Sequence, residues 1–359
     1  MSSIRLFSGF LAISILASVF QAAWIISLAV FLAERFPLLS GGAIASGAIA
    51  FSYVTSILAR GNARRGLTWG LQIIALGMAA LSTGIWWGCL IVAAGLGVVR
   101  ASQLSLVAGL STLEPSRAFS LYNAAINLAY LMGGIAAYGI SSRWGWGGLW
   151  LVSAIVSGIA SVFSLFINPV PRPETNRTPA KWQPLAVVAL LVVVTGYFFV
   201  AAQYQTVLAI LVEQECPRIR SGGLGAVHGL GVLVFSLLQS ALRGNKGDAG
   251  ALAVGLLFVA GSFVVLAATA RLDSLQLVVS VGLVSVGETV VGANMQALGS
   301  RLAGLGRSAY WLAALVGYLL SGAASLVWQP ALRQAYLLTI AGLCLLSGAV
   351  ALWGLKRDR

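Results

Sequence analysis

Three ionisable residues interrupt long apolar stretches of the chain. Glu288 lies in the stretch SVGETVVG, Arg100 lies in LGVVRASQ, and His228, the single histidine of the sequence, lies in GAVHGLGV. A carboxylate and an imidazole can bind and release protons, whereas a guanidinium can hold a carboxylate through paired hydrogen bonds. Because an ionisable group is costly to bury in apolar surroundings, these three residues are the first candidates for function.

The composition is that of a membrane protein. Hydrophobic residues make up 59% of the 359 residues and charged residues only 9%, whereas a soluble domain is about one quarter charged. Apolar runs of about 20 residues, each long enough to cross a bilayer, recur from one end of the chain to the other. The first run is too long for the core of a signal peptide, and we expect it to be the first spanning helix.

We predict an all-α membrane protein with twelve transmembrane helices. The predicted spans cover residues 7–33, 39–59, 67–86, 87–110, 118–141, 147–168, 184–212, 222–242, 250–270, 275–300, 308–328 and 334–355. An even number of spans places both termini on the same side of the membrane. Most lysines and arginines lie at the termini and in the loops on that side, which predicts cytoplasmic termini and a location in the cytoplasmic (inner) membrane.

The charge and the cysteines indicate neither a nucleic-acid partner nor a metal. The net charge of +13 is explained by loop residues that set the topology, so we expect no nucleic-acid partner. The three cysteines, Cys89, Cys216 and Cys344, lack the spacing of metal sites. We therefore predict no metal and no cofactor.

One polar, proline-rich segment divides the chain. The segment NPVPRPETNRTPAKWQP at 168–184 predicts a cytoplasmic linker over 169–183, between an N-terminal six-helix bundle at 1–168 and a C-terminal six-helix bundle at 184–359. A weak repeat supports the division, because an Arg-Gly-Asn triplet follows the second span at Arg60 and the eighth span at Arg243. Two six-helix bundles are the layout of major facilitator transporters, whose solute site lies near the midplane between the bundles.

In that layout the first, fourth, seventh and tenth helices line a central cavity, so Arg100 and Glu288 face each other from opposite bundles. The further candidate solute-binding residues are Gln21, Trp24, Gln203, Tyr204, Gln205, His228, Trp311 and Tyr318. The alternatives are that Arg100 and Glu288 only pair to hold the bundles together, that His228 caps a carbonyl, and that the tryptophans and Tyr318 only pack.

Four stretches resemble motifs of the proton-dependent oligopeptide transporter family. GLGVVRAS at 95–102 is similar to the helix-four motif, with Arg100 in place of its lysine, and GETVVGANMQALGSRLA at 287–303 is similar to the helix-ten motif, with Glu288 at its acid. SRAFSLYNAAINLAYLMGG at 116–134 resembles the helix-five motif, which adds Asn123 and Asn127 as candidate solute contacts. YWLAALVGYLLSG at 310–322 resembles helix eleven. The resemblance implies proton-driven transport of peptides or peptide-like solutes.

The chain departs from that family at its other acidic sites. The first helix has no counterpart of the family's Glu-x-x-Glu-Arg-Phe cluster, because the aligned stretch LASVFQAAWII is uncharged, and Gln203 lies near the place of the helix-seven acid. Glu288 is then the one carboxylate that we expect at mid-membrane, and it is the predicted proton-coupling residue. A competing similarity exists, because Arg100 and Gln103 also fit the Arg-x-x-Gln core of helix four in proton-coupled drug exporters.

The sequence therefore predicts a secondary active transporter rather than an enzyme, since no aspartate lies in a predicted span and no Gly-Lys-Ser/Thr loop for ATP is present. We expect alternating access and symport, with a peptide-like solute directing its carboxylate to Arg100 and its amine to Glu288. The alternatives are a proton-coupled exporter of a drug-like or amphipathic metabolite and, in a different class, a non-transporting receptor or assembly factor. The expected partners are a small solute, protons and membrane lipid, and the expected state is a monomer.

Overall fold

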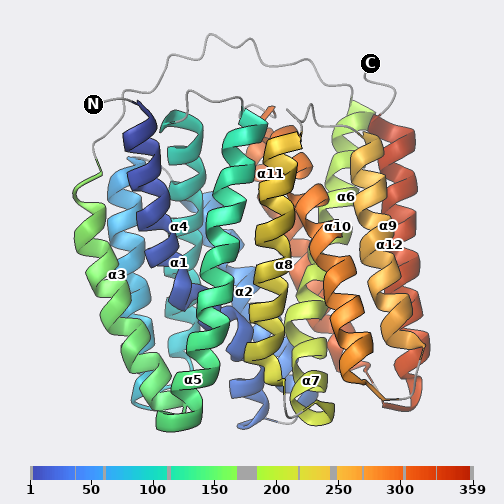
Figure 1. Ribbon diagram of the computed structural model, residues 1–359, viewed down its shortest axis with the longest axis horizontal. Helices are drawn as coiled ribbons and strands as arrows, with labels where there is room; N and C mark the ends of the chain where they lie inside the picture. Colours follow the sequence, from blue (N-terminus) through green and yellow to red (C-terminus); the bar gives the residue numbers. More distant parts are fainter. Residues whose placement is uncertain are drawn as a thin grey trace.

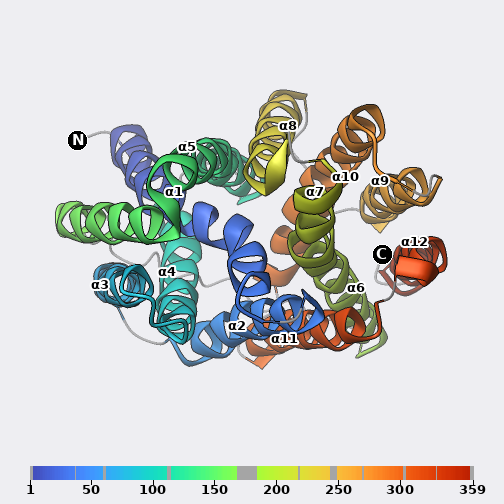
Figure 2. The same cartoon turned by 90° about the horizontal axis from the view of Figure 1, so that it is seen from below.

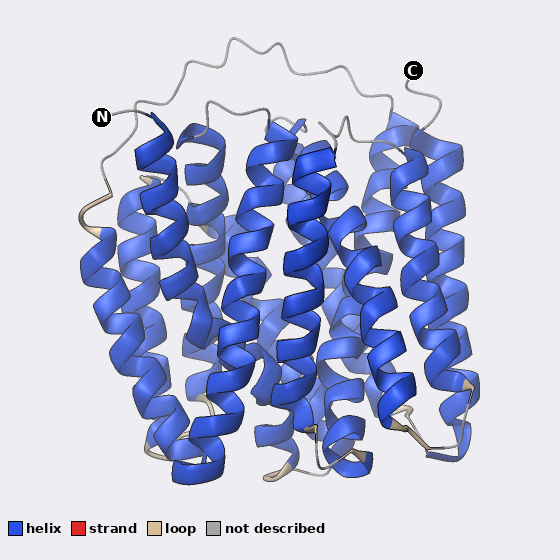
Figure 3. Ribbon diagram, viewed as in Figure 1, coloured by secondary structure: helices blue, strands red, loops and turns tan. Residues whose placement is uncertain are grey.

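The chain folds into helices throughout the part that the structure describes. This computed structural model describes residues 3–36, 38–59, 62–110, 115–167, 184–216, 219–242, 249–268, 271–301, 305–328 and 330–355. Every regular element in these ranges is helical (Figure 3), which confirms the predicted all-α class. The predicted linker at 169–183 and the triplet positions Arg60 and Arg243 lie outside the described residues.

The first part of the chain forms α1 (Ser3–Ala33), α2 (Leu38–Leu58), α3 (Ala63–Ser82), α4 (Gly88–Leu110) and α5 (Pro115–Ser164). α3 begins where the Asn62 side chain accepts hydrogen bonds from the backbone N–H groups of Arg64 and Arg65 and so caps the first turn. Inside α5, Gly145 has a φ of 64°, which a residue without a Cβ atom adopts readily. The chain reverses there, and Figure 1 shows the two limbs of α5 running in opposite directions.

The second part of the chain opens with one long continuous helix that contains a single π-helical segment. α6 (Pro184–Gln203), the π-helical segment η1 (Tyr204–Leu208) and α7 (Ala209–Glu215) follow one another without a break. A π segment fits extra chain into a helical turn and is frequent at functional sites. The remaining elements are α8 (Arg220–Leu242), α9 (Ala249–Ala267), α10 (Ser274–Arg301), α11 (Leu305–Leu326), the short η2 (Pro330–Leu332) and α12 (Arg333–Leu355).

Ten helices within the described residues are long and apolar enough to cross a membrane, so these criteria alone do not reproduce the predicted count of twelve. α3, which begins with two arginines in its first turn, is not among the ten. The stretch Ala118–Ser164 counts as one element of 47 residues, although it contains the separate predicted spans 118–141 and 147–168.

The helices stand side by side in two groups. α1 begins and α12 ends at the same end of the bundle (Figure 1). Viewed along the helices, α1, α3, α4 and α5 lie on one side and α6, α7, α9, α10 and α12 on the other (Figure 2). The two sides meet where α2 packs against α11 and where α5 packs against α8.

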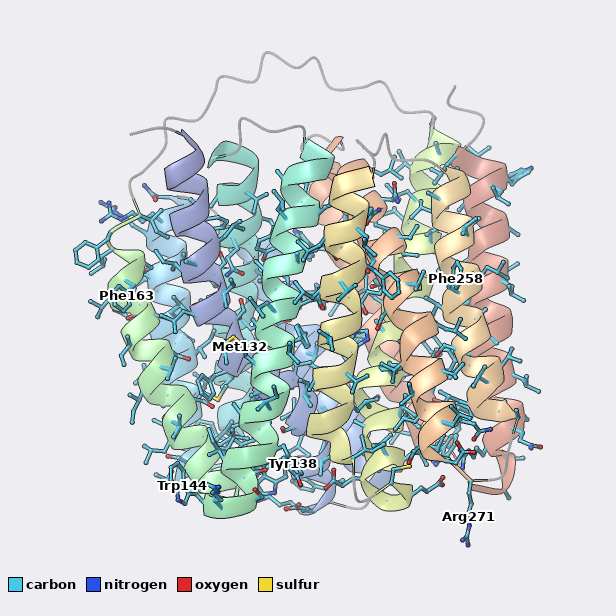
Figure 4. All side chains as sticks on the ribbon, viewed as in Figure 1. Met132, Tyr138, Trp144, Phe163, Phe258 and Arg271 are labelled. Carbon is cyan, nitrogen blue, oxygen red and sulfur yellow. The ribbon has the colours of Figure 1, made fainter. Side chains whose placement is uncertain are left out.

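Large apolar side chains cover the outside of the bundle. Met132, Phe163 and Phe258 are exposed and project away from the ribbon in Figure 4, as expected of a surface that faces lipid. Trp144 and Arg271 lie at the end away from the start of α1. Aromatic and basic residues at the end of a bundle suit the boundary between lipid and water.

Glycines bring α5 and α8 into close contact between the two sides. A Cβ atom at Gly229 on α8 would lie 2.5 Å from the backbone nitrogen of Leu131, and one at Gly134 on α5 would lie 2.6 Å from the backbone nitrogen of Ala226. Non-bonded atoms do not approach so closely, so a larger residue at either position would push the two helices apart. Small residues are the usual means of close helix contact in membranes.

Candidate functional site

A cavity lies between the two sides of the bundle. Its lining comes from α1, α5, α8, α9, α10 and the long helix made of α6, η1 and α7. Apolar side chains form much of the lining, and the larger polar side chains are Asn127, Tyr130, Tyr197, Tyr204, Gln205, His228 and Glu288. A mainly apolar pocket with a few convergent polar groups is the usual form of a small-molecule site.

The side chains of Glu288 and His228 meet at hydrogen-bond distance in this cavity. Nε2 of His228, on α8, lies 2.9 Å from Oε2 of Glu288, on α10. The glutamate side chain is 34% exposed and the histidine side chain 13% exposed. The carboxylate is therefore the member of the pair that an entering molecule meets more readily.

Ser285 holds the other nitrogen of the imidazole. Its Oγ lies 3.3 Å from Nδ1 of His228 and 2.7 Å from the carbonyl oxygen of Val281, one turn earlier on α10. When the hydroxyl donates to Val281, Nδ1 must carry a hydrogen to bond to Oγ; when the hydroxyl turns to Nδ1, that nitrogen accepts. The same contacts can thus hold a protonated or a neutral imidazole.

Gly231 permits the close approach of α8 and α10 that this arrangement requires. A Cβ atom at Gly231 would lie 2.6 Å from Oγ of Ser285. One turn before Gly231, His228 is then within reach of both Ser285 and Glu288. The glycine-rich sequence of α8 therefore contributes directly to the geometry of the pair.

The π-helical segment places Tyr204 beside the pair. Its ring centroid lies 5.5 Å from that of His228 and 6.5 Å from that of Phe263. Tyr204 is buried, lines the cavity and lies beside Ser280 of α10. Because a hydroxyl can donate and accept hydrogen bonds at the same time, this group is suited to bind a polar atom that enters the cavity.

Arg100 forms no ion pair with Glu288 in the described part of the chain, where the carboxylate contacts His228 instead. Its guanidinium carbon lies 4.7 Å from the ring centroid of Tyr53 on α2, in a cation–π contact. Its Nη1 atom is buried and makes no hydrogen bond within the described residues. Arg100 is not one of the cavity-lining residues, because α4 packs against α2 and presents this side chain to Tyr53.

Aromatic rings connect Arg100 to the cavity. The ring of Tyr53 lies 5.3 Å from that of Tyr318 on α11, and the Tyr318 hydroxyl donates a hydrogen bond of 2.8 Å to Oε1 of Gln205. Gln205 lines the cavity, so Tyr318 acts on the cavity by orienting this amide. Trp311, which lies on α11 like Tyr318, packs against Tyr53 of α2, with ring centroids 5.8 Å apart.

Gln203 is turned away from the cavity. Its Nε2 donates to the backbone oxygen and to Oγ of Ser321 over 3.1 and 2.9 Å, and its Oε1 accepts a hydrogen bond of 2.6 Å from Tyr336. The side chain is buried and ties α6 to α11 and α12. Its neighbours Tyr204 and Gln205 line the cavity instead.

The remaining sequence-predicted residues lie in the core beside the cavity. Gln21 and Trp24 on α1 are buried, and their side-chain nitrogens have no hydrogen-bond partner within the described residues. α1 contributes Ile26 to the lining. On α5, Asn127 lines the cavity and donates a hydrogen bond of 2.8 Å to the backbone oxygen of Asn123. Asn123 is not one of the cavity-lining residues.

Tyr130, Tyr197 and Ser285 belong to the site but were not singled out from the sequence. Tyrosine and serine are common in apolar helices, so their residue types carry little signal. Spacing was the available signal, because residues three apart share a helix face. Ser285 stands three residues before Glu288, and Tyr130 stands three residues after Asn127.

Apolar helices that surround a cavity with polar groups from both sides are the architecture of a multi-pass membrane protein with a solute site. A family model described as Major Facilitator Superfamily matches residues 6–325, and the chain belongs to this superfamily. The superfamily predicted from the sequence is thereby confirmed. No curated protein sequence matches the chain.

Solved peptide transporters share the fold. A structure described under substrate recognition in proton dependent oligopeptide transporters is 15% identical, with a TM-score of 0.83, and the match covers 100% of this chain and 99% of that one. A mutant of the peptide transporter POT in complex with alafosfalin is 15% identical, with a TM-score of 0.78 and coverage of 100% and 99%. A POT family transporter in complex with 5-aminolevulinic acid is 13% identical, with a TM-score of 0.79 and coverage of 98% and 96%. The resemblance inferred from the sequence motifs is confirmed at the level of the fold.

Proposed function

We propose that this protein is a secondary active transporter of a small polar or peptide-like solute and that it is coupled to protons through Glu288. The observation that carries the proposal is the His228–Glu288 pair in a cavity between the two sides of the bundle. The pair can bind and release a proton at the place where an entering solute meets the carboxylate. Ionisable groups at membrane depth in such cavities are typical of transport sites.

The proposed topology has twelve spans in two bundles. Adding α3 to the ten long apolar helices and counting the two limbs of α5 separately completes this number. The bundles comprise 1–168 and 184–359 and are joined by a linker at 169–183. The positive-inside rule then places both termini in the cytoplasm and the protein in the cytoplasmic membrane, where the bundles rock about the cavity in alternating access.

The solute is proposed to present an amine to Glu288. No lysine or arginine is among the cavity-lining residues in the described part of the chain, so the cavity offers a carboxylate to an amine but neither a guanidinium nor an ammonium to an acid. The relatives described as peptide transporters support a solute with an amine terminus. Such a solute needs no contact with Arg100, which lies behind Tyr53.

Flux into proteoliposomes tests this function. The probes are labelled alanyl-alanine, its C-terminal amide, which keeps the amine, and its N-acetyl derivative, which keeps only the carboxylate. The first two are expected to enter faster than they enter protein-free liposomes, and the N-acetyl derivative is not. Flux of none of them would contradict the proposal and favour a receptor or assembly factor, and flux of an amphipathic cation alone would favour the exporter.

Tyr318→Phe is expected to weaken binding of alanyl-alanine a few-fold, because Gln205 loses the hydrogen bond that orients its amide in the cavity. One such bond contributes about 0.5–1.5 kcal/mol. The dissociation constant, measured by calorimetry, checks this. The matched control is Tyr336→Phe, which removes a hydrogen bond to Gln203 outside the cavity and is expected to leave affinity unchanged. Equal losses in the two variants would show that Gln205 has no special role.

A further inference from the structure

His228 is the nearest candidate counter-ion for Glu288. Their side chains are 2.9 Å apart. The other titratable groups that line the cavity are the phenols of Tyr130 on α5, Tyr197 on α6 and Tyr204 on η1, while the residues contributed by α1 and α9 are uncharged. The guanidinium of Arg100 lies on the ring of Tyr53 at the α2 side. When it is protonated, the imidazole is therefore the group that balances the charge of the carboxylate locally.

An ammonium group from a solute and the imidazolium of His228 need the same partner. Glu288 is the acid that lines this cavity within the described residues. Two cations in one largely apolar cavity repel each other strongly, because the dielectric screening there is weak. An imidazolium can relieve that repulsion by releasing its proton, whereas an alkylammonium does so much less readily.

Ser285 and Tyr204 make the exchange feasible. After the proton is released, the Ser285 hydroxyl can turn from Val281 to donate to Nδ1 of His228, so the neutral imidazole keeps a hydrogen bond. Tyr204 lines the cavity beside Ser280, its ring centroid lies 5.5 Å from that of His228, and its hydroxyl oxygen keeps lone pairs that can accept a hydrogen. It provides an acceptor for a second N–H of the ammonium.

We propose that His228 is a resident counter-ion that an entering amine displaces from Glu288, and that this displacement releases one proton. The solute brings one positive charge to the carboxylate, the imidazolium becomes imidazole, and the proton leaves to the side of the membrane that the cavity faces. The total charge is the same before and after. This step rests on the proposed function and makes His228 the group that carries the exchanged proton.

The step has a consequence for the direction of coupling. Because the site holds either the solute amine or the extra proton, solute and proton cross the membrane in opposite directions. This differs from the symport expected from the sequence. It also predicts that the apparent dissociation constant for the amine rises about tenfold for each unit by which the pH falls, while the imidazolium is the resting form.

The single histidine of the chain makes a direct test possible. Protein purified with a histidine-free tag and labelled with ¹⁵N-histidine shows one imidazole, whose two nitrogen shifts report its protonation. In mildly acidic buffer, the free protein is expected to show imidazolium. Saturating alanyl-alanine amide is expected to shift both signals to those of a neutral imidazole, and N-acetyl-alanyl-alanine to leave them unchanged.

Two variants complete the test. Glu34→Gln changes an acid in a separate hollow and is expected to respond to the amide as the wild type does. Glu288→Gln is expected to lose the response. An imidazolium that persists at saturation, a neutral imidazole at every pH before the amide is added, or no binding of the amide would each overturn the displacement. If one of these results is found but gradient-driven flux still requires Glu288, the proposed transport function stands and only the displacement of His228 is rejected.

Discussion

Glu288→Gln is expected to abolish solute uptake driven by a proton gradient, while exchange of solute between the two sides of the membrane continues at raised solute concentration. Glutamine has nearly the size of glutamate, and its amide can still bond to His228 across the 2.9 Å contact, so the packing is kept. The amide can neither take up a proton nor hold a full negative charge. Coupling is lost because the amide neither takes up a proton itself nor holds the imidazolium of His228, and the affinity for the amine falls because the negative charge is gone.

Counterflow and gradient-driven uptake in matched proteoliposomes separate these effects. Glu34→Gln is the control, because Glu34 is an exposed acid away from the cavity whose Oε2 accepts a hydrogen bond of 2.7 Å from Trp146, which an amide oxygen can also accept. This control is expected to transport like the wild type. If Glu288→Gln also accumulates solute at the wild-type rate, Glu288 does not couple transport to protons.

Gly229→Ala is expected to reduce transport at least tenfold. The added Cβ atom would lie 2.5 Å from the backbone nitrogen of Leu131 and 2.9 Å from the carbonyl oxygen of Asn127. These are backbone atoms of α5, so relief requires the helices to separate, since no side chain can turn away. Separation would disturb the two cavity residues nearest to this contact, Asn127 on α5 and His228 on α8.

The matched control is Gly139→Ala. Gly139 lies on α5, and an added Cβ atom there meets no atom within 4 Å. Alanine is the better helix former by roughly 1 kcal/mol, so this control is expected to fold and transport normally. Solute uptake and the melting temperature are measured for both. Normal transport by Gly229→Ala would mean that the close α5–α8 contact is dispensable to the transport cycle.

The helices could be predicted from the sequence because each apolar run is long enough to cross a bilayer as a helix, whatever its neighbours are. The turn inside α5 at Gly145 lies between the two predicted spans 118–141 and 147–168, as the prediction requires. The π segment at Tyr204–Leu208 had no sequence signal, because it reflects how the long helix fits against its neighbours.

The site was only partly predictable for a related reason. The cost of burying an ionisable group singled out Glu288 and His228, and the structure brings these two together. The sequence also indicated the helix of Arg100 but not which way that helix is rotated. Packing of α4 against α2 decides the rotation and directs the guanidinium to Tyr53. The direction of a side chain was equally unpredictable for Gln203 and Gln205. They lie two positions apart in the sequence, but only Gln205 lines the cavity.

The most direct test of proton coupling is solute accumulation under gradients of both signs. Proteoliposomes are loaded with an acidic or a neutral lumen, and labelled alanyl-alanine is measured inside and outside, with protein-free liposomes correcting for passive trapping of the amine. The predicted result is accumulation above the outside concentration with the acidic lumen, abolished by a protonophore and by Glu288→Gln. Accumulation with an acidic exterior instead would keep the coupling and reject the displacement of His228. Equal concentrations inside and outside under both gradients would contradict proton coupling itself.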